Sequence, residues 1–213
     1  MESNILIEEV AHRLDALLPA EIQFLEQRDP FRFLISVILS AQTTDRIVNA
    51  VVRDLFAVFP TKQSLADATT AQVEQIIFPT GYYRNKAKHI IACAQALLDQ
   101  DLPDTMEELV KLPGVGRKTA SCVLGDIYGK PAIIVDTHFS RVVNRLGLVS
   151  SNDPVIVERQ IRTMLAAQMQ YRFSMTVNLF GRTTCHAKKP ECEHCPLGDL
   201  CPSRDGFLKK SST

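Results

Sequence analysis

Four cysteines near the end of the chain have the residue type and the spacing of a metal-ligand set. Cys185, Cys192, Cys195 and Cys201 follow the pattern Cys-x6-Cys-x2-Cys-x5-Cys, and four thiolates this close together can surround one metal centre. A zinc ribbon would need two separated Cys-x2-Cys pairs, so a compact loop around a [4Fe–4S] cluster is favoured. Disulfides and a thioredoxin-like pair are disfavoured, because we expect no secretory signal and see no βαβ pattern.

A Gly-x-Gly turn over residues 112–118 (Leu-Pro-Gly-Val-Gly-Arg-Lys) joins two predicted helices. The segment Asp104–Glu107 resembles a capping box at the start of the first helix. The glycines allow left-handed backbone angles and close approach of another chain. The second helix would then direct its free N–H groups outward, which makes an anion site suited to phosphate. A plain helix–helix turn is the alternative, and the flanking Leu-Pro and Arg-Lys favour the phosphate site.

Lys118 and Asp136 are the two residues near this turn that could carry a reaction. Lys118 lies away from the predicted apolar stripe of its helix, beside the small residues Ser121, Cys122 and Gly125. An amine attacks only as the neutral base, so its surroundings must favour that form. Asp136 precedes a predicted helix and is well placed as its N-cap, which would hold the carboxylate rigidly. The residues alone leave open whether Lys118 is a nucleophile or a phosphate contact, and whether the two side chains meet.

Nearly every segment of the chain has the periodicity of a helix. Apolar residues recur at helical spacing over 5–17, 34–38, 47–55, 87–98, 120–127 and 139–146, and prolines fall between these stretches. Asp153 and Pro154 have the order of an N-cap followed by the first helical residue. The only β-like stretch, residues 133–135, is too short for a sheet. The sequence therefore predicts an all-α protein.

Composition and charge fit a globular protein and leave the partner open. The chain has 213 residues, 46% of them hydrophobic, and no apolar run long enough to cross a membrane. The formal net charge is zero. Residues 1–30 carry seven acidic and two basic side chains, so the remainder carries 22 basic and 17 acidic ones. A local basic surface is thus possible, although charge alone does not identify a nucleic-acid partner.

Four segments together resemble the endonuclease III family of DNA glycosylases, in the helix-hairpin-helix superfamily. They are residues 40–45 (Ser-Ala-Gln-Thr-Thr-Asp), residues 112–120 (Leu-Pro-Gly-Val-Gly-Arg-Lys-Thr-Ala), residues 135–138 (Val-Asp-Thr-His) and the four-cysteine loop. Their order and spacing are highly specific, and the resemblance covers almost the whole chain.

The resemblance implies two helical domains. Residues 23–130 would form a six-helix domain with the helix-hairpin-helix motif. Residues 1–22 and 131–213 would form a discontinuous iron–sulfur cluster domain. DNA would lie in an interdomain cleft. We expect a monomer that binds double-stranded DNA containing damaged bases or abasic sites, in the cytoplasm and on the nucleoid, with no membrane partner.

The resemblance also assigns roles to individual residues. Lys118 would be the nucleophile, Asp136 its catalytic partner, and the four cysteines the [4Fe–4S] ligands. Gln42 would fill the hole left by the flipped base. Tyr82 would be the wedge, at a position where an aliphatic residue is common in the family. The remaining DNA contacts would come from Leu112, Gly114, Val115, Gly116, Arg117, His138, Lys188 and Lys189.

The implied activity is removal of oxidised pyrimidines followed by β-elimination at the abasic site. A monofunctional relative, such as the adenine glycosylase acting opposite 8-oxoguanine, is the nearest alternative. That group lacks a lysine at the position of Lys118 and usually has an extra C-terminal domain. A non-catalytic DNA-binding module with structural zinc is the alternative from another class. In that case Lys118 would contact phosphate and Asp136 would only cap a helix.

Overall fold

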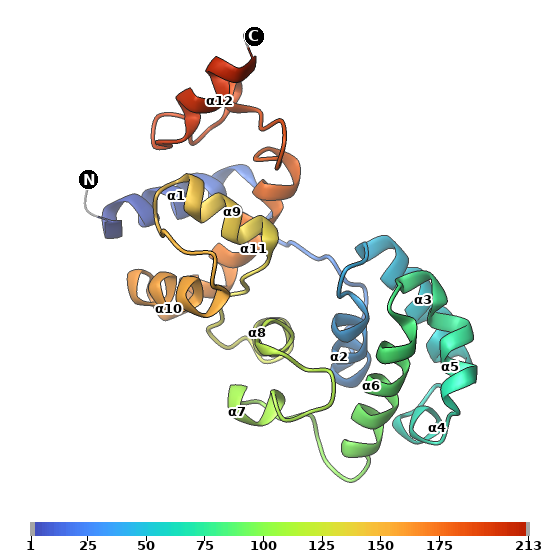
Figure 1. Ribbon diagram of the computed structural model, residues 1–213. Coiled ribbons are helices and arrows are strands. Elements are labelled where there is room, and N and C mark those ends of the chain that lie inside the picture. The colour runs from blue at the N-terminus through green and yellow to red at the C-terminus, as the bar shows by residue number, and fades with distance from the viewer. Residues whose placement is uncertain (1–2, 212–213) are drawn as a thin grey trace. The chain divides into compact units, whose positions relative to one another are not determined.

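The computed structural model describes residues 3–211 and confirms the all-α prediction. Its described residues form twelve α-helices and two short 3-10 turns, without a strand (Figure 1). The chain divides into two compact units. One runs from Gln23 to Gly129, and the other combines the chain up to Ile22 with the chain from Lys130 onward.

The continuous unit holds the helices from the first part of the chain. They are α2 (Pro30–Leu39), α3 (Asp45–Val58), α4 (Lys62–Ala66), α5 (Thr70–Ile77), α6 (Tyr83–Ala96), α7 (Met106–Leu109) and α8 (Arg117–Asp126), with the 3-10 turn η1 (Phe78–Thr80) between α5 and α6. Its fully buried side chains include Leu34, Leu39, Leu55, Ile77 and Ile90. In this unit α6 packs against α4, α5 and α2, and α8 packs against α2 and α7.

The discontinuous unit joins the first helix to the last third of the chain. Its elements are α1 (Ser3–Leu17), α9 (Thr137–Arg145), α10 (Pro154–Met164), α11 (Ala167–Thr183), the 3-10 turn η2 (Cys192–His194) and α12 (Arg204–Ser211). Ile7, Val10 and Leu14 of α1 enter the same core as residues of α9 and α11. The rings of Phe139 and Phe173 meet edge to face in this core, with centroids 6.0 Å apart.

Side-chain caps start many of these helices. Asp29 accepts from the Arg32 N–H at the start of α2, and Asp153 accepts from two N–H groups at the start of α10. Pro154 follows Asp153 as the first helical residue, as predicted. At α7, however, the cap is Thr105 and its partner is Glu108. The N-cap therefore lies one residue further along the chain than predicted, and Glu108 accepts from the Thr105 hydroxyl.

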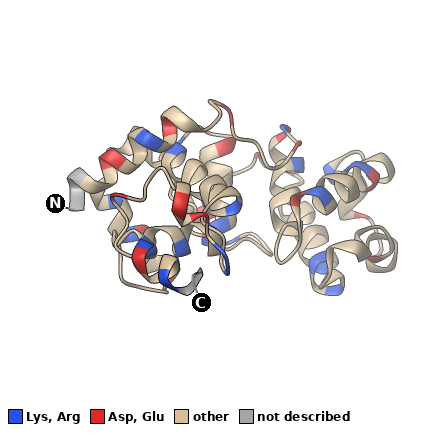
Figure 2. Ribbon diagram, turned by 90° about the horizontal axis from the view of Figure 1, so that it is seen from above, with Lys and Arg blue, Asp and Glu red and all other residues tan. Residues whose placement is uncertain are grey.

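Charged side chains of both signs occur on helices throughout the chain (Figure 2). Two acidic groups of the first thirty residues have defined partners. Asp15 accepts from Arg172 Nε at 2.6 Å, and Glu9 accepts from Arg13 Nε at 2.7 Å. Arg13 also forms a bidentate pair with Asp199 at 2.6 and 3.0 Å, which ties α1 to the segment holding the cysteines. Among the described helices, none has both the length and the apolar character needed to span a membrane.

Candidate active site and metal centre

The four cysteines of the predicted metal site line one cavity. Cys185 follows α11, Cys192 begins η2, Cys195 directly follows η2, and Cys201 precedes α12. Leu146, Phe180 and Leu197 contribute apolar walls. No disulfide joins any two of the six cysteines, all of which lie among the described residues. Within the described residues, no three His, Cys, Asp or Glu side chains lie close enough together to hold a single metal ion.

The chemistry of this cavity suits a cationic cluster. Burial raises the pKa of the thiols of Cys192, Cys195 and Cys201, and the neighbouring cysteines raise them further. Four thiolates in this apolar surrounding therefore require positive charge among them. The iron atoms of a bound cluster would supply that charge, because thiolates are their usual ligands. The donor set and its surroundings thus fit an iron–sulfur cluster.

Arg145, at the end of α9, holds the cysteine loop from one side. Its Nη1 donates to Cys185 Sγ at 3.3 Å and to the His186 carbonyl at 2.7 Å, and its Nη2 donates to the Ala187 carbonyl at 2.8 Å. The guanidinium also lies over the ring of Phe207, 4.4 Å from the centroid. Sequence reasoning missed this residue, because it lies outside the apolar stripe of its helix.

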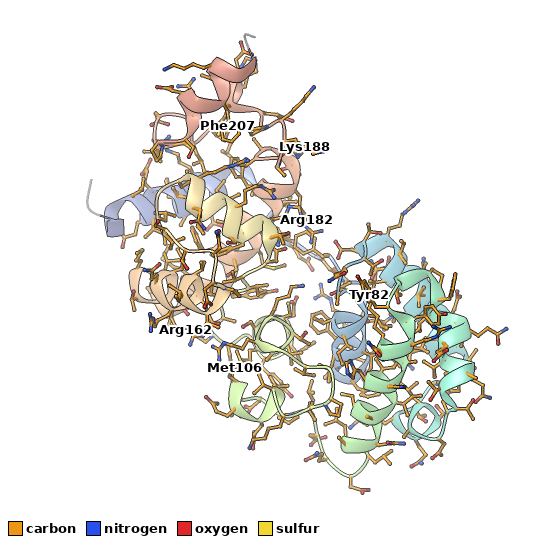
Figure 3. All side chains as sticks on the ribbon, viewed as in Figure 1. Tyr82, Met106, Arg162, Arg182, Lys188 and Phe207 are labelled. Carbon is orange, nitrogen blue, oxygen red and sulfur yellow. The ribbon has the colours of Figure 1, made fainter. Side chains whose placement is uncertain are left out.

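Lys188 and Lys189, in the segment between the first two cysteines, are exposed. Figure 3 shows Lys188 on the loop beyond the end of α11 and Arg182 on α11 itself. The loop that carries both lysines is held by the Arg145 bonds and by the Glu191 N–H, which donates to the Thr184 carbonyl at 3.0 Å. Two lysines are therefore presented to solvent on a fixed backbone.

Asp136 is the N-cap of α9, as predicted. Its Oδ1 accepts from the Phe139 N–H at 2.8 Å, and its Oδ2 accepts from the Asn178 amide of α11. Arg182 Nε in turn donates to Asn178 Oδ1 at 2.7 Å. Both carboxylate oxygens of the half-buried Asp136 are thus held in place. Asn178 was not predicted, because it lies 42 residues further along the chain and no local pattern relates it to Asp136.

His138 lies in the first turn of α9 and is half-buried. Its Nδ1 lies 3.3 Å from Arg141 Nη2, and Arg141 also donates to the carbonyls of Gly181 and Cys185 at 2.7 and 3.0 Å. Gly181 of α11 packs closely here, since a Cβ atom at that position would come 3.0 Å from His138 Cβ. The histidine therefore has a local partner, and its predicted DNA contact stays a prediction.

The two glycines of the hairpin between α7 and α8 have different roles. Gly114 has φ +78, and a Cβ added there would come 2.7 Å from His89 Cβ. Gly116 is the N-cap of α8 with φ −93, and no side chain caps this helix. Of the two glycines, Gly114 alone therefore uses a left-handed backbone angle. Gly116 leaves open space beside the N-terminus of α8, because nothing beyond its chain neighbours lies within 4 Å of the place of a Cβ atom.

Three of the predicted hairpin contacts differ in exposure. The side chains of Leu112 and Val115 are buried, so a DNA contact at these positions would involve the backbone. Arg117 is exposed at the first position of α8. Lys118 follows it and is also exposed, in the first helical turn. Of the small residues on its side of α8, Ser121 and Gly125 are buried.

Gln42 and Tyr82, the predicted hole-filler and wedge, share an unusual conformation. Gln42 has φ 55 and Tyr82 has φ 50, and they are the only non-glycine residues with positive φ in the described part of the chain. Both side chains are exposed, Tyr82 to 68%, and Figure 3 shows Tyr82 on the turn ahead of α6. Left-handed backbone at residues other than glycine is uncommon and often marks functional positions.

The candidate residues fall into two sets. Gln42, Tyr82, the hairpin and Lys118 belong to the continuous unit. Asp136, His138, the two lysines and the four cysteines belong to the discontinuous unit. In the discontinuous unit the structure also adds Asn178, which bonds to Asp136 although it lies 42 residues further along the chain.

Comparisons with known proteins identify the family. A family model described as HhH-GPD superfamily base excision DNA repair protein matches residues 35–167. The iron-sulfur binding domain of endonuclease III matches residues 185–201, so the chain carries the predicted [4Fe–4S] cluster and the zinc alternative is wrong. An endonuclease III from Synechocystis sp. is 39% identical over 194 residues, covering 89% of this chain and 89% of the relative.

Solved structures agree with this result. The chain matches a non-covalent endonuclease III–DNA complex with a TM-score of 0.93 and 36% identity, over 98% of this chain and 100% of that one. A trapped endonuclease III–DNA covalent intermediate matches to the same extent, with a TM-score of 0.93, 36% identity and coverage of 98% and 100%. The chain therefore belongs to the endonuclease III family, within the HhH-GPD superfamily of base excision DNA repair proteins.

Proposed function

We propose that this protein is a bifunctional DNA glycosylase and AP lyase that removes oxidised pyrimidines from duplex DNA. The observation that carries the proposal is the exposed amine of Lys118 in the first turn of α8. A relative of 36% identity has been solved as a covalent intermediate with DNA, and covalent catalysis on a sugar needs such a nucleophile.

The first chemical step breaks the bond between base and sugar. The damaged nucleotide leaves the base stack, because the enzyme cannot reach a stacked base. The neutral Lys118 amine attacks C1′, and the C1′–N bond breaks, so that the base leaves with the electron pair and takes up a proton. Asp136 stabilises the positive charge that develops on the sugar and assists proton transfer. Hydrogen bonds from the N-terminus of α9 and from Asn178 hold the Asp136 carboxylate in place, which suits that role.

The second step cuts the strand. Loss of a proton from the Lys118 nitrogen and opening of the sugar ring give a protonated Schiff base, which makes the C2′ proton acidic. Removal of that proton moves its electron pair into a C1′–C2′–C3′ conjugated system. The C3′–O bond breaks, and the 3′ phosphate leaves with its electron pair. Water then hydrolyses the Schiff base and restores the amine of Lys118.

The other predicted residues would hold the DNA. The uncapped N-terminus of α8 and the backbone of Gly114 and Gly116 would bind phosphate, because free N–H groups and the helix dipole favour an anion there. Lys188 and Lys189 would contact the phosphate backbone, and Gln42 and Tyr82 would enter the base stack. We expect a monomer in the cytoplasm, associated with the nucleoid.

The cluster would be held by Cys185, Cys192, Cys195 and Cys201. When bound, it supplies a rigid anchor for the loop and positive charge for four thiolates. The residues of this chain do the rest, since Arg145 holds the loop backbone and the loop presents Lys188 and Lys189 to solvent.

Borohydride trapping on a duplex with one oxidised pyrimidine tests the proposal. The wild type should form a covalent protein–DNA adduct, and Lys118→Ala should bind the duplex but form none. Lys111→Ala is the matched control, because Lys111 is an exposed lysine of the same hairpin. An adduct with Lys118→Ala at the wild-type level would refute the role of this lysine. An adduct on an abasic duplex but not on an oxidised pyrimidine would refute the proposed substrate.

A further inference from the structure

A buried lysine connects the two segments that carry Gln42 and Tyr82. Lys86 lies in the first turn of α6 and is only 5% exposed. Its Nζ donates to the Leu39 carbonyl at 2.9 Å and to the Thr80 carbonyl at 2.8 Å. Leu39 is the last residue of α2, and Thr80 is the last residue of η1. One ammonium group therefore bonds to the ends of two helical segments.

The chemistry of these two helix ends explains why the charge is buried. Carbonyls in the last turn of a helix have no partner within the helix, and the helix dipole places negative partial charge there. Both features of these helix ends favour a bound cation. Burial lowers the pKa of Lys86 to about 8, so the protonated form with its positive charge still predominates at neutral pH. A buried ammonium without such acceptors would be strongly unfavourable.

Both bonded carbonyls lie just ahead of the predicted DNA-inserting residues. Gln42 follows Leu39 by three residues, and Tyr82 follows Thr80 by two. In each case the chain turns through a left-handed residue and presents an exposed side chain. The second turn is also held by the Asn85 and Lys86 N–H groups, which both donate to the Tyr82 carbonyl at 3.2 Å. Lys86 thus links the two turns directly.

We propose that Lys86 is a positioning residue that joins the turns of Gln42 and Tyr82 into one unit, so that both side chains enter the DNA together. The inference rests on the proposed roles of Gln42 and Tyr82. Lys86 does not touch DNA in this proposal. It acts by fixing the distance and direction between the two turns, which a duplex with one displaced nucleotide must match at the same time.

Lys86→Met tests the proposal, because methionine is of similar length and apolar but cannot donate to the carbonyls. The matched control is Lys88→Met, an exposed lysine two residues further along α6. Unstacking would be followed by the fluorescence of 2-aminopurine placed next to a tetrahydrofuran abasic-site analogue. Single-turnover cleavage of a lesion duplex and the Kd for undamaged duplex would be measured beside it, with the folded fraction of each variant known from its melting curve.

For Lys86→Met we expect a loss of about tenfold or more in the unstacking rate and in single-turnover cleavage, with the Kd for undamaged DNA changed by less than about threefold. Lys86→Arg, which keeps the charge and the donors, should recover part of the lost rate, and Lys88→Met should match the wild type. A Lys86→Met protein with wild-type unstacking would overturn the inference. A loss of rate that equals the loss of folded protein, without recovery in Lys86→Arg, would overturn it as well.

A double-mutant cycle in the presence of Lys86 gives a second test, which holds even if Lys86→Met does not fold. Gln42→Ala and Tyr82→Ala would be combined. If the two side chains act as one unit, the double variant should lose about as much unstacking rate as the worse single variant, because neighbouring effects are then not additive. A double loss equal to the product of the two single losses would overturn the link. Full unstacking in both single variants would refute the proposed roles of Gln42 and Tyr82 themselves.

Discussion

The two glycines of the hairpin give a prediction with a control in the same turn. We expect Gly114→Ala to destabilise the protein and Gly116→Ala to leave its stability nearly unchanged. Gly114 has φ +78, and its new methyl group would come 2.7 Å from His89 Cβ, whereas Gly116 has φ −93 and open space at the same place. The left-handed angle costs an alanine about 1–2 kcal/mol.

The contact with His89 adds to this cost at position 114. Its nearest atom is Cβ, so rotation of the histidine ring does not relieve it and the backbone of α6 or of the hairpin must move. Overpacking of this kind costs about 1–3 kcal/mol. The sum is roughly 2–5 kcal/mol, which corresponds to a fall in melting temperature of about 4–20 °C for a chain of this size.

Thermal melting followed by circular dichroism, with the cluster bound, measures both variants. Duplex binding then separates the roles further. Gly116→Ala should weaken binding despite its normal stability, because the new methyl group lies where a phosphate would approach the free N-terminus of α8. Equal melting temperatures of the two variants would refute the reasoning about Gly114. Equal DNA affinity of Gly116→Ala and the wild type would refute the reasoning about Gly116.

Three further predictions concern residues that the structure adds to the site. Asn178→Leu removes a bond to the Asp136 carboxylate; hydrogen bonds to charged groups are worth about 1.5–3 kcal/mol, so single-turnover cleavage should fall roughly 10- to 100-fold while duplex affinity, measured by fluorescence anisotropy, stays the same. Arg145→Met removes the bonds to Cys185 Sγ and two loop carbonyls, so the iron chromophore should bleach faster with a chelator than in the wild type. Burial lowers the pKa of Lys86 from 10.5 to about 8, so the unfolded chain binds more protons between these pH values and wild-type stability should rise with pH across this window. Relative to Lys86→Met, the free energy of unfolding measured in urea should rise by about 2 kcal/mol between pH 7.5 and pH 10, and an unchanged difference would contradict the shift.

Local signals predicted the features that depend on neighbouring residues. The N-cap roles of Asp136 and Asp153 are confirmed, because a cap needs only the few residues that follow it. The helical content is confirmed because apolar periodicity marks a helix without knowledge of its partner. The cysteine spacing carried the cluster prediction, since all four cysteines lie in one short loop.

The missed features depend on contacts between distant segments. Lys86 bonds to a carbonyl 47 residues away, and Asn178 bonds to a carboxylate 42 residues away. A local sequence pattern does not predict contacts between residues so far apart in the chain. Lys86 did leave a weak signal, because it lies four residues ahead of the buried Ile90 on the same face of α6. Gly114 and Gly116 look alike in the sequence, and the structure distinguishes them by their backbone angles and by the position of His89.

The division of the discontinuous unit has a consequence for biosynthesis. The apolar face of α1, with Ile7, Val10 and Leu14, is buried against residues of α9 and α11, and α11 begins only at Ala167. At about 5–20 residues per second, a ribosome needs on the order of 10 s to translate the chain between Leu17 and Ala167. During that time the whole compact unit from Gln23 to Gly129 is synthesised. The nascent first helix therefore keeps its apolar face uncovered over that time, which leaves it open to aggregation or to binding by a chaperone.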